Sequence, residues 1–152
     1  MKISFTGTQN GMVTFQKNEL KERLEEFSCS ELINGGCIGA DAESWEIAAD
    51  CGVRIFHIFP SYIKTKQGIW VSFGYSNDEY IEYKSKEGVF RIKIEKEEAP
   101  LIRNKKIVDE SDMLIACPKE HQHTLRSGIW STIRYAWKRK KKVIIIPPIV
   151  RD

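Results

Sequence analysis

The chain has 152 residues, of which 41% are hydrophobic and 30% charged, and its formal net charge is +3. This length and balance predict one soluble globular domain with a real core. No apolar run approaches the roughly 20 residues that a membrane-spanning helix requires. The start, Met1–Phe5, is typical of a strand and not of a signal peptide. Four cysteines without a C-x-x-C pair indicate reduced thiols, so we expect a cytoplasmic protein.

A run of five basic residues, Lys138–Lys142, accounts for the positive net charge, and without it the chain would be slightly acidic. Proteins that bind DNA usually gather basic residues over a whole face. This run instead falls at the end of a predicted helix, where cations interact favourably with the helix dipole. We interpret it as a solvated helix terminus and keep a nucleic-acid contact as the alternative.

Strand-like and helix-like segments alternate along the chain. The expected strands are 2–6, 32–34, 53–59, 112–116 and 142–146, and the expected helices are 14–27, 41–51, 100–110 and 128–141. The first set is rich in strand formers, and the second carries apolar residues at helical spacing. This alternation predicts an α/β fold, a Rossmann-like parallel sheet of about five strands with helices on both faces.

Residues 61–99 interrupt the alternation and are too many for an ordinary connection. Within them, residues 69–73 and 89–94 both alternate between apolar and polar side chains. We therefore expect an inserted β-hairpin or small sheet within the single domain 1–152. The insertion could cover a ligand, form a subunit contact, or bury only a satellite apolar cluster.

Three glycine-containing loops follow predicted strands. In an open parallel sheet, ligands bind outside the carboxyl ends of the strands, near the switch in strand order. Glycines let a ligand approach the backbone, and N–H groups beside a helix start suit a phosphate. Each loop alone could be a capped turn, but together they predict a nucleotide-like ligand. The residues concerned are Gly7, Thr8 and Gln9; Gly35, Gly36, Cys37, Ile38, Gly39 and Asp41; and Arg126, Ser127, Gly128, Ser131 and Thr132.

Several side chains near these loops could contact a ligand, and most of them have a structural role as the alternative. Asp41 could accept a hydrogen bond from a ribose hydroxyl, or it could cap a helix. Arg103, next to Asn104, could pair with a phosphate or with a surface carboxylate. Arg126 carries a planar guanidinium that matches phosphate oxygens. Trp130 could stack on a base or pack in the core.

No catalytic, metal or cofactor set emerges from the residues. His121 and His123 form a weak metal pattern with no third ligand, and no serine or aspartate completes a triad. We expect no metal site and no resident cofactor, and we expect His57, inside a strand, to be structural.

The loop motifs resemble those of the SLOG superfamily, Rossmann-like proteins named for the DNA-processing protein Smf and the plant cytokinin enzyme LONELY GUY. The similar segments are Phe5–Thr8, Gly35–Asp41, Arg103–Ala116 and Arg126–Thr132. The match covers the sheet and its helices but not residues 61–99, and it is greatest to small bacterial and phage members. The resemblance implies a nucleotide or nucleotide-derived ligand over the strand ends, and often a homodimer.

The chain departs from the phosphoribohydrolases of that family in its catalytic residues, above all in a missing carboxylate. Their motif P-G-G-x-G-T-x-x-E grips a phosphate and supplies a carboxylate. On this sequence the Gly-Thr step of the motif aligns with Ser131–Thr132, and its Glu aligns with Tyr135. Arg103 aligns with an arginine that assists catalysis in those enzymes, and Asn104 stands where they have a lysine. An oxocarbenium-like transition state requires a nearby negative charge, and tyrosine has none at neutral pH.

We therefore predict a binding protein for a nucleotide or an NAD- or ADP-ribose-derived molecule. It would be a sensor or a sequestering protein, such as a phage sponge that removes a host nucleotide signal. The alternative is an enzyme that cleaves an N-glycosidic bond in a nucleotide, with Asp41 or Asp112 replacing the missing Glu. The second alternative is single-stranded DNA binding. A homodimer or higher homo-oligomer is expected, and no membrane partner.

Overall fold

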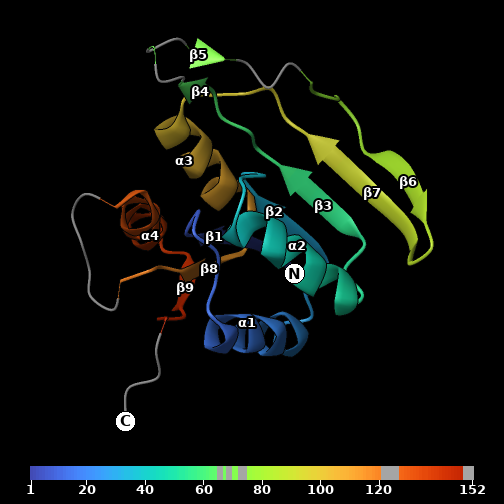
Figure 1. The fold of residues 1–152 in the computed structure, drawn as a ribbon, viewed down its shortest axis with the longest axis horizontal. Helices are drawn as coiled ribbons and strands as arrows, with labels where there is room; N and C mark the ends of the chain where they lie inside the picture. Colours follow the sequence, from blue (N-terminus) through green and yellow to red (C-terminus); the bar gives the residue numbers. More distant parts are fainter. Residues whose placement is uncertain (65–66, 68–69, 72–74, 121–126, 149–152) are drawn as a thin grey trace.

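The structure, a computed structural model, describes residues 1–64, 67, 70–71, 75–120 and 127–148. Its main sheet has seven strands in the order β6-β7-β3-β2-β1-β8-β9 (Figure 1). Neighbouring strands are parallel, except that β6 is antiparallel to β7. The strands are β1 (Lys2–Gly7), β2 (Glu31–Asn34), β3 (Ile55–Ile58), β6 (Ile81–Ser85), β7 (Gly88–Ile94), β8 (Met113–Cys117) and β9 (Lys142–Ile145).

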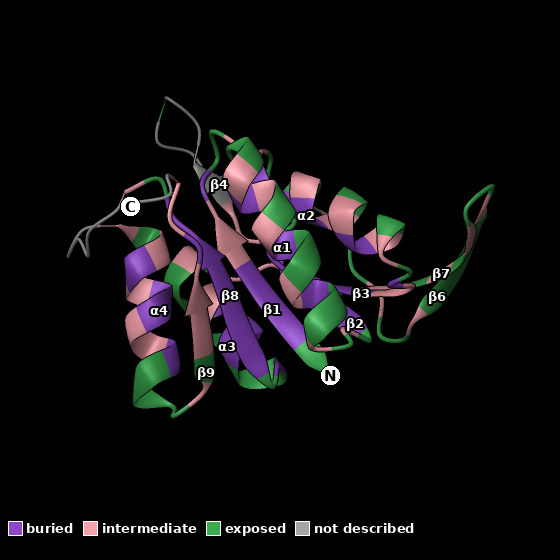
Figure 2. Ribbon diagram, turned by 90° about the horizontal axis from the view of Figure 1, so that it is seen from below, coloured by how far each residue is buried: buried purple, intermediate pink, exposed green. Residues whose placement is uncertain are grey.

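Four helices in the described part of the chain cover the two faces of this sheet. Figure 2 shows one pair on each side: α1 packs against α2, and α3 packs against α4. Their bounds are α1 (Thr14–Glu26), α2 (Ala40–Asp50), α3 (Pro100–Glu110) and α4 (Gly128–Lys138). The arrangement confirms the predicted Rossmann-like α/β fold with helices on both faces.

The central strands have a core on each side, which explains their nearly continuous apolar sequences. All five residues of β8 are buried. Met113 and Ile115 pack in the cluster that includes residues of α1 and α2, whereas Leu114 and Ala116 pack in the cluster with residues of α3 and α4. Successive side chains point to opposite faces of a strand, so each helix pair covers alternate residues.

The inserted segment extends the main sheet. β7 pairs in parallel with β3, and β6 returns antiparallel to β7 through a turn at residues 86–87. Two short strands, β4 (Ile63–Lys64) and β5 (Trp70–Val71), pair separately. The expected inserted hairpin is therefore present as β6–β7, and it contains the predicted strand 89–94. Of the other predicted strand, 69–73, the structure describes residues 70–71, which form β5. β7 pairs with β6, from which two residues separate it, because closing so short a loop costs little conformational entropy.

The basic run does not continue α4 as expected. The helix ends at Lys138, and Lys140 adopts a left-handed backbone with φ of 59°. The Lys141 ammonium donates to the Ser111 carbonyl at 2.6 Å, and the Lys142 ammonium lies 4.3 Å from the centre of the Phe27 ring. Part of this charge is thus already engaged within the protein.

Candidate ligand-binding site

The strand order switches at β1, which β2 flanks on one side and β8 on the other. The carboxyl ends of these strands face a cavity of about 540 Å³. This is the location at which open α/β sheets bind ligands. Of the predicted site residues, those that line the cavity are Gly7, Thr8, Gln9, Gly35, Cys37, Asp41, Arg103, Asn104, Ser127 and Gly128.

The other predicted residues lie elsewhere. Trp130 is 5% exposed and packs in the core under α4, so its core-packing alternative holds. The Thr132 hydroxyl donates to the Gly128 carbonyl at 2.9 Å within the same helix. Those outside the cavity lining are Gly36, Ile38, Gly39, Trp130, Ser131 and Thr132. Arg126, His121, Gln122 and His123 lie outside the described residues.

Arg103 is the best-anchored side chain of the cavity. It lies in the first turn of α3, which starts at a proline, and it is buried. Its Nη1 donates to the carbonyls of Gly35 at 3.3 Å and Phe59 at 3.2 Å. Its Nε donates to the Asn104 side chain at 2.9 Å. The guanidinium therefore joins the ends of β2 and β3, and within the described part of the chain it forms no ion pair with a surface carboxylate.

Two glycines are required by close approaches around this cavity. A Cβ at Gly35 would lie 2.3 Å from Nη1 of Arg103. A Cβ at Gly39, where φ is +82°, would lie 2.2 Å from the Gln9 carbonyl oxygen. The Ala40 N–H also donates to the Thr8 carbonyl at 3.0 Å. The loops after β1 and β2 are therefore in direct contact, and they form one wall.

Asp41 lies inside α2, so its predicted role as helix N-cap was wrong; the N-cap is Gly39. Its carboxylate accepts the Cys37 N–H at 3.2 Å, while the Asn34 side chain accepts the Gly36 N–H at 2.9 Å. Burial raises the pKa of the Asp41 carboxyl to about 6, although the Cys37 N–H and the Arg103 charge oppose this. The glycine turn thus holds its own buried carboxylate, and fewer of its N–H groups remain for a phosphate than predicted.

The sequence reasoning missed a charged pair after β8. Lys119 is exposed and Glu120 is partly buried, and both line the cavity. The Glu120 Oε2 atom is buried and has no hydrogen-bond partner among the described residues. Both residues follow a predicted strand, so they could have been found from the tendency of ligands to bind at the carboxyl ends of parallel strands. Other lining residues outside the predicted set are Phe5, Thr6, Asn10, Ile107 and Ile129.

Tyr135, which the motif alignment places at the position of the missing catalytic Glu, lies away from the cavity. The Tyr135 hydroxyl bonds the Asp109 carboxylate at 2.8 and 2.9 Å. Asp112 accepts the Lys2 N–H at 2.8 Å, at the amino end of β1. Of the two aspartates considered as replacements, Asp41 alone reaches the cavity.

Among the described residues, no group of histidine, cysteine and acidic side chains could hold a metal ion. The described helices are all too short or too polar to cross a membrane. His57 is buried in β3, and its Nε2 lies 2.8 Å from the Glu95 carboxylate.

The fold and the position of the cavity define a Rossmann-like α/β protein with a pocket at the strand ends. A similar solved structure is that of DNA processing protein A from Streptococcus pneumoniae, with a TM-score of 0.62 and 16% identical residues. The match covers 99% of this chain and 52% of that protein, so the chain spans about half its length. At this identity the similarity shows the fold alone. No family model and no curated protein matches the chain.

Proposed function

We propose that this protein binds a nucleotide, or a small molecule derived from NAD or ADP-ribose, and acts as a sensor or sequestering protein. The observation that carries the proposal is the convergence of three strand-end loops and the buried Arg103 on one cavity of about 540 Å³. Small-molecule pockets usually have volumes of roughly 300–1,000 Å³, so a nucleotide is a suitable occupant.

Positive charge and helix geometry give the cavity an anion-binding side. Arg103 and Lys119 supply the cations, and the start of α4 at Gly128 supplies backbone N–H groups. The Ser127 hydroxyl accepts the Trp130 N–H at 3.4 Å, and the N–H groups before it have no acceptor within the helix itself. We assign the phosphates of the ligand to this side.

Asp41 gives another part of the cavity a negative charge when it is ionised. Asp41 lines the cavity, and a carboxylate there can accept hydrogen bonds from sugar hydroxyls, as an acidic residue does in many dinucleotide sites. Its pKa is raised to about 6, so its ionisation should govern this contact. Affinity for ADP-ribose should increase as the pH rises through about 6. A decrease would mean that a phosphate lies beside Asp41 instead. ADP-ribose suits this test because its diphosphate lacks the ionisation near about pH 6 of a terminal phosphate.

A second candidate is hydrolysis of the N-glycosidic bond in the same ligand class. It is favoured by two carboxylates in one cavity, Asp41 and Glu120, because glycoside hydrolysis commonly uses a pair of acidic residues. Asp41 would stabilise the developing positive charge on the sugar, and Glu120 would orient water. The missing motif Glu argues against this candidate, so we place it second.

The first experiment incubates the purified protein with mononucleotides, NAD, ADP-ribose, cyclic ADP-ribose forms and a single-stranded oligonucleotide. Bound and free fractions are then separated and analysed by mass spectrometry. One compound recovered intact on denaturation supports the binding protein. Free base with a ribose phosphate supports the hydrolase. Retention of the oligonucleotide alone, with steep salt dependence, would favour single-stranded DNA binding.

Variants of the cationic side test the site itself. Lys119→Ala should weaken binding of the retained compound about tenfold, because one exposed charge-assisted contact is worth roughly 1–2 kcal/mol. Arg126→Ala should weaken it at least about tenfold if that residue also contacts phosphate. Lys21→Ala, on the exposed surface of α1, is the matched control and should bind as wild type does. Unchanged affinity of both site variants would refute the assignment.

A further inference from the structure

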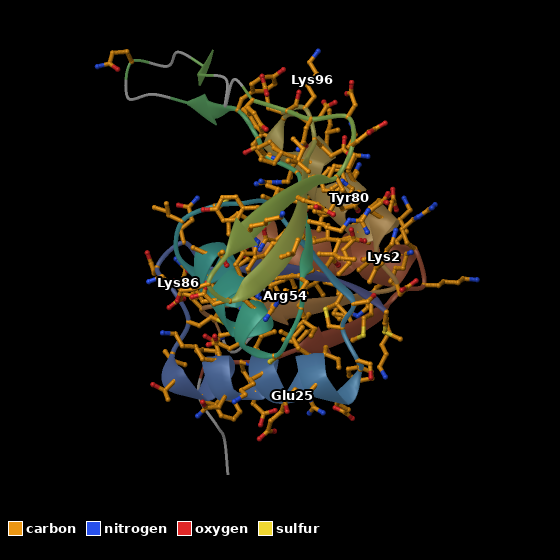
Figure 3. The ribbon with its side chains drawn as sticks, turned by 90° about the vertical axis from the view of Figure 1, so that its right-hand side faces the viewer. Lys2, Glu25, Arg54, Tyr80, Lys86 and Lys96 are labelled. Carbon is orange, nitrogen blue, oxygen red and sulfur yellow. The ribbon has the colours of Figure 1, made fainter. Side chains whose placement is uncertain are left out.

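Strand β6 is an open edge of the main sheet. It is the terminal strand in the order, and its residues Ile81, Glu82, Tyr83 and Lys84 are all exposed. Figure 2 shows the β6–β7 hairpin extending beyond the helix-covered body, and Figure 3 shows it from the side, with Lys86 at its turn. The described lining of the cavity includes no residue of this hairpin. Open edges are templates for pairing with another strand.

The hydrogen-bond alternation shows which backbone groups of β6 face outward. The Arg91 N–H on β7 donates to the Arg54 carbonyl on the far side, toward β3, at 2.8 Å. Arg91 and its β6 partner Glu82 therefore form a non-hydrogen-bonded pair. By alternation, Lys84 opposite Val89 is the next such pair. The N–H and C=O groups of Glu82 and Lys84 thus point away from the sheet.

These two outward residues are self-complementary in charge. In an antiparallel pairing of two β6 strands around Tyr83, Glu82 of each copy faces Lys84 of the other, and each such pair can exchange both backbone hydrogen bonds. Shifting the strands by two residues one way places Glu82 against Glu82. Shifting them the other way places Lys84 against Lys84. Opposite charges therefore select one register, with a two-fold axis at Tyr83.

The apolar face of the hairpin supports the same pairing. Tyr83 is 61% exposed and Ile81 is 47% exposed. Both point to the side where Phe90 and Ile92 lie, next to an apolar cleft of about 260 Å³ between the hairpin and α2. A two-fold axis at Tyr83 places the partner's ring against this one, which covers exposed aromatic surface beside that cleft.

We propose that two copies of this chain associate through their β6 strands, antiparallel around Tyr83, to form one continuous sheet. The occupant of the edge is thus a second copy of the same chain, chosen by the Glu82–Lys84 complementarity. This interface is independent of the ligand proposed above.

Complementary charge reversals test the proposal. Sedimentation equilibrium over a concentration series should show a wild-type dimer. Glu82→Lys alone creates facing lysines and Lys84→Glu alone creates facing glutamates, so each should weaken association roughly tenfold or more. An equimolar mixture of the two variants restores both opposite-charge pairs and should dimerise about as well as wild type. Glu22→Lys and Lys21→Glu on exposed α1 make the same charge changes away from the edge and should leave association unchanged.

The mixture separates the interface from misfolding, because a variant that fails to fold cannot associate when its complement is added. Recovery on mixing establishes the register. A wild-type monomer at all concentrations would overturn the proposal. So would a dimer that both reversals leave intact, or single-variant losses that mixing does not repair.

Discussion

Gly39 joins two of the loops that form the cavity, and replacing it with alanine should be among the most damaging small changes in the chain. Its backbone has φ of 82° and ψ of −126°, a conformation that residues with a Cβ rarely adopt. Such strain costs about 1–3 kcal/mol. A Cβ would also lie 2.2 Å from the carbonyl oxygen and 2.5 Å from the carbonyl carbon of Gln9. Because these are backbone atoms, the loop after β1 must move, and the total cost should exceed about 3 kcal/mol.

Gly52 provides the matched comparison. Its φ is +91°, but no atom lies within 4 Å of its ideal Cβ position. Gly52→Ala should therefore cost only the conformational part, about 1–2 kcal/mol. In a chain of this size 1 kcal/mol shifts Tm by about 2–4 °C. We expect Gly39→Ala to lower Tm by about 10 °C and Gly52→Ala by about 3–5 °C.

Urea unfolding followed by circular dichroism would measure both variants, and ligand titration would measure the first. Gly39→Ala should also weaken binding, since the displaced loop carries the cavity residues Thr8 and Gln9. Equal stability losses in the two variants would show that the contact between the loops is not tight, and the reasoning would fail.

Three further changes have defined outcomes. Burial raises the Asp41 pKa to about 6, above its unfolded value of about 4, so ionisation of this carboxyl opposes folding. Relative to Asp41→Asn, the free energy of unfolding of the wild type should therefore fall by up to about 3 kcal/mol between pH 4 and 7. A difference between the two proteins that does not change with pH in urea unfolding would contradict this. Gln16→Leu removes the amide that donates at 2.8 and 2.9 Å to carbonyls following β8 and β9; it should cost about 2–3 kcal/mol, whereas a loss below about 0.5 kcal/mol would mean that water replaces the amide. Ser127→Ala removes the α4 cap and should cost about 1 kcal/mol by thermal unfolding, with Ser127→Asp as the variant expected to retain stability.

The order of strands and helices could be predicted because each element has its own local pattern. Residues 100–110 carry a proline start and helical spacing, and α3 has those bounds. Pairing is not local: residues 89–94 alternate like a strand, but alternation does not name the partners, which are β3 and β6. The end of α4 was missed, because a lysine run has good helix propensity even where Lys140 turns left-handed.

The cavity could be anticipated because parallel strands bring their carboxyl ends to one edge, whatever loops follow them. The contacts between the side chains and loops that form the cavity could not be anticipated from the sequence. That the Arg103 guanidinium bonds two carbonyls, or that Gly39 packs against Gln9, depends on the packing of distant segments. Asp41 shows the same limit, since its burial and raised pKa follow from neighbours that a local motif does not specify.

The cavity draws its lining from Phe5 to Ile129, so no local segment of the chain contains it. A ligand that fits would therefore be linked to unfolding of the whole sheet. At a concentration about a hundred times its Kd it would add about 2.7 kcal/mol to the free energy of unfolding, or roughly 5–10 °C in Tm. Thermal melting in the presence of candidate compounds thus offers a direct way to identify the natural ligand, without any assay of chemistry.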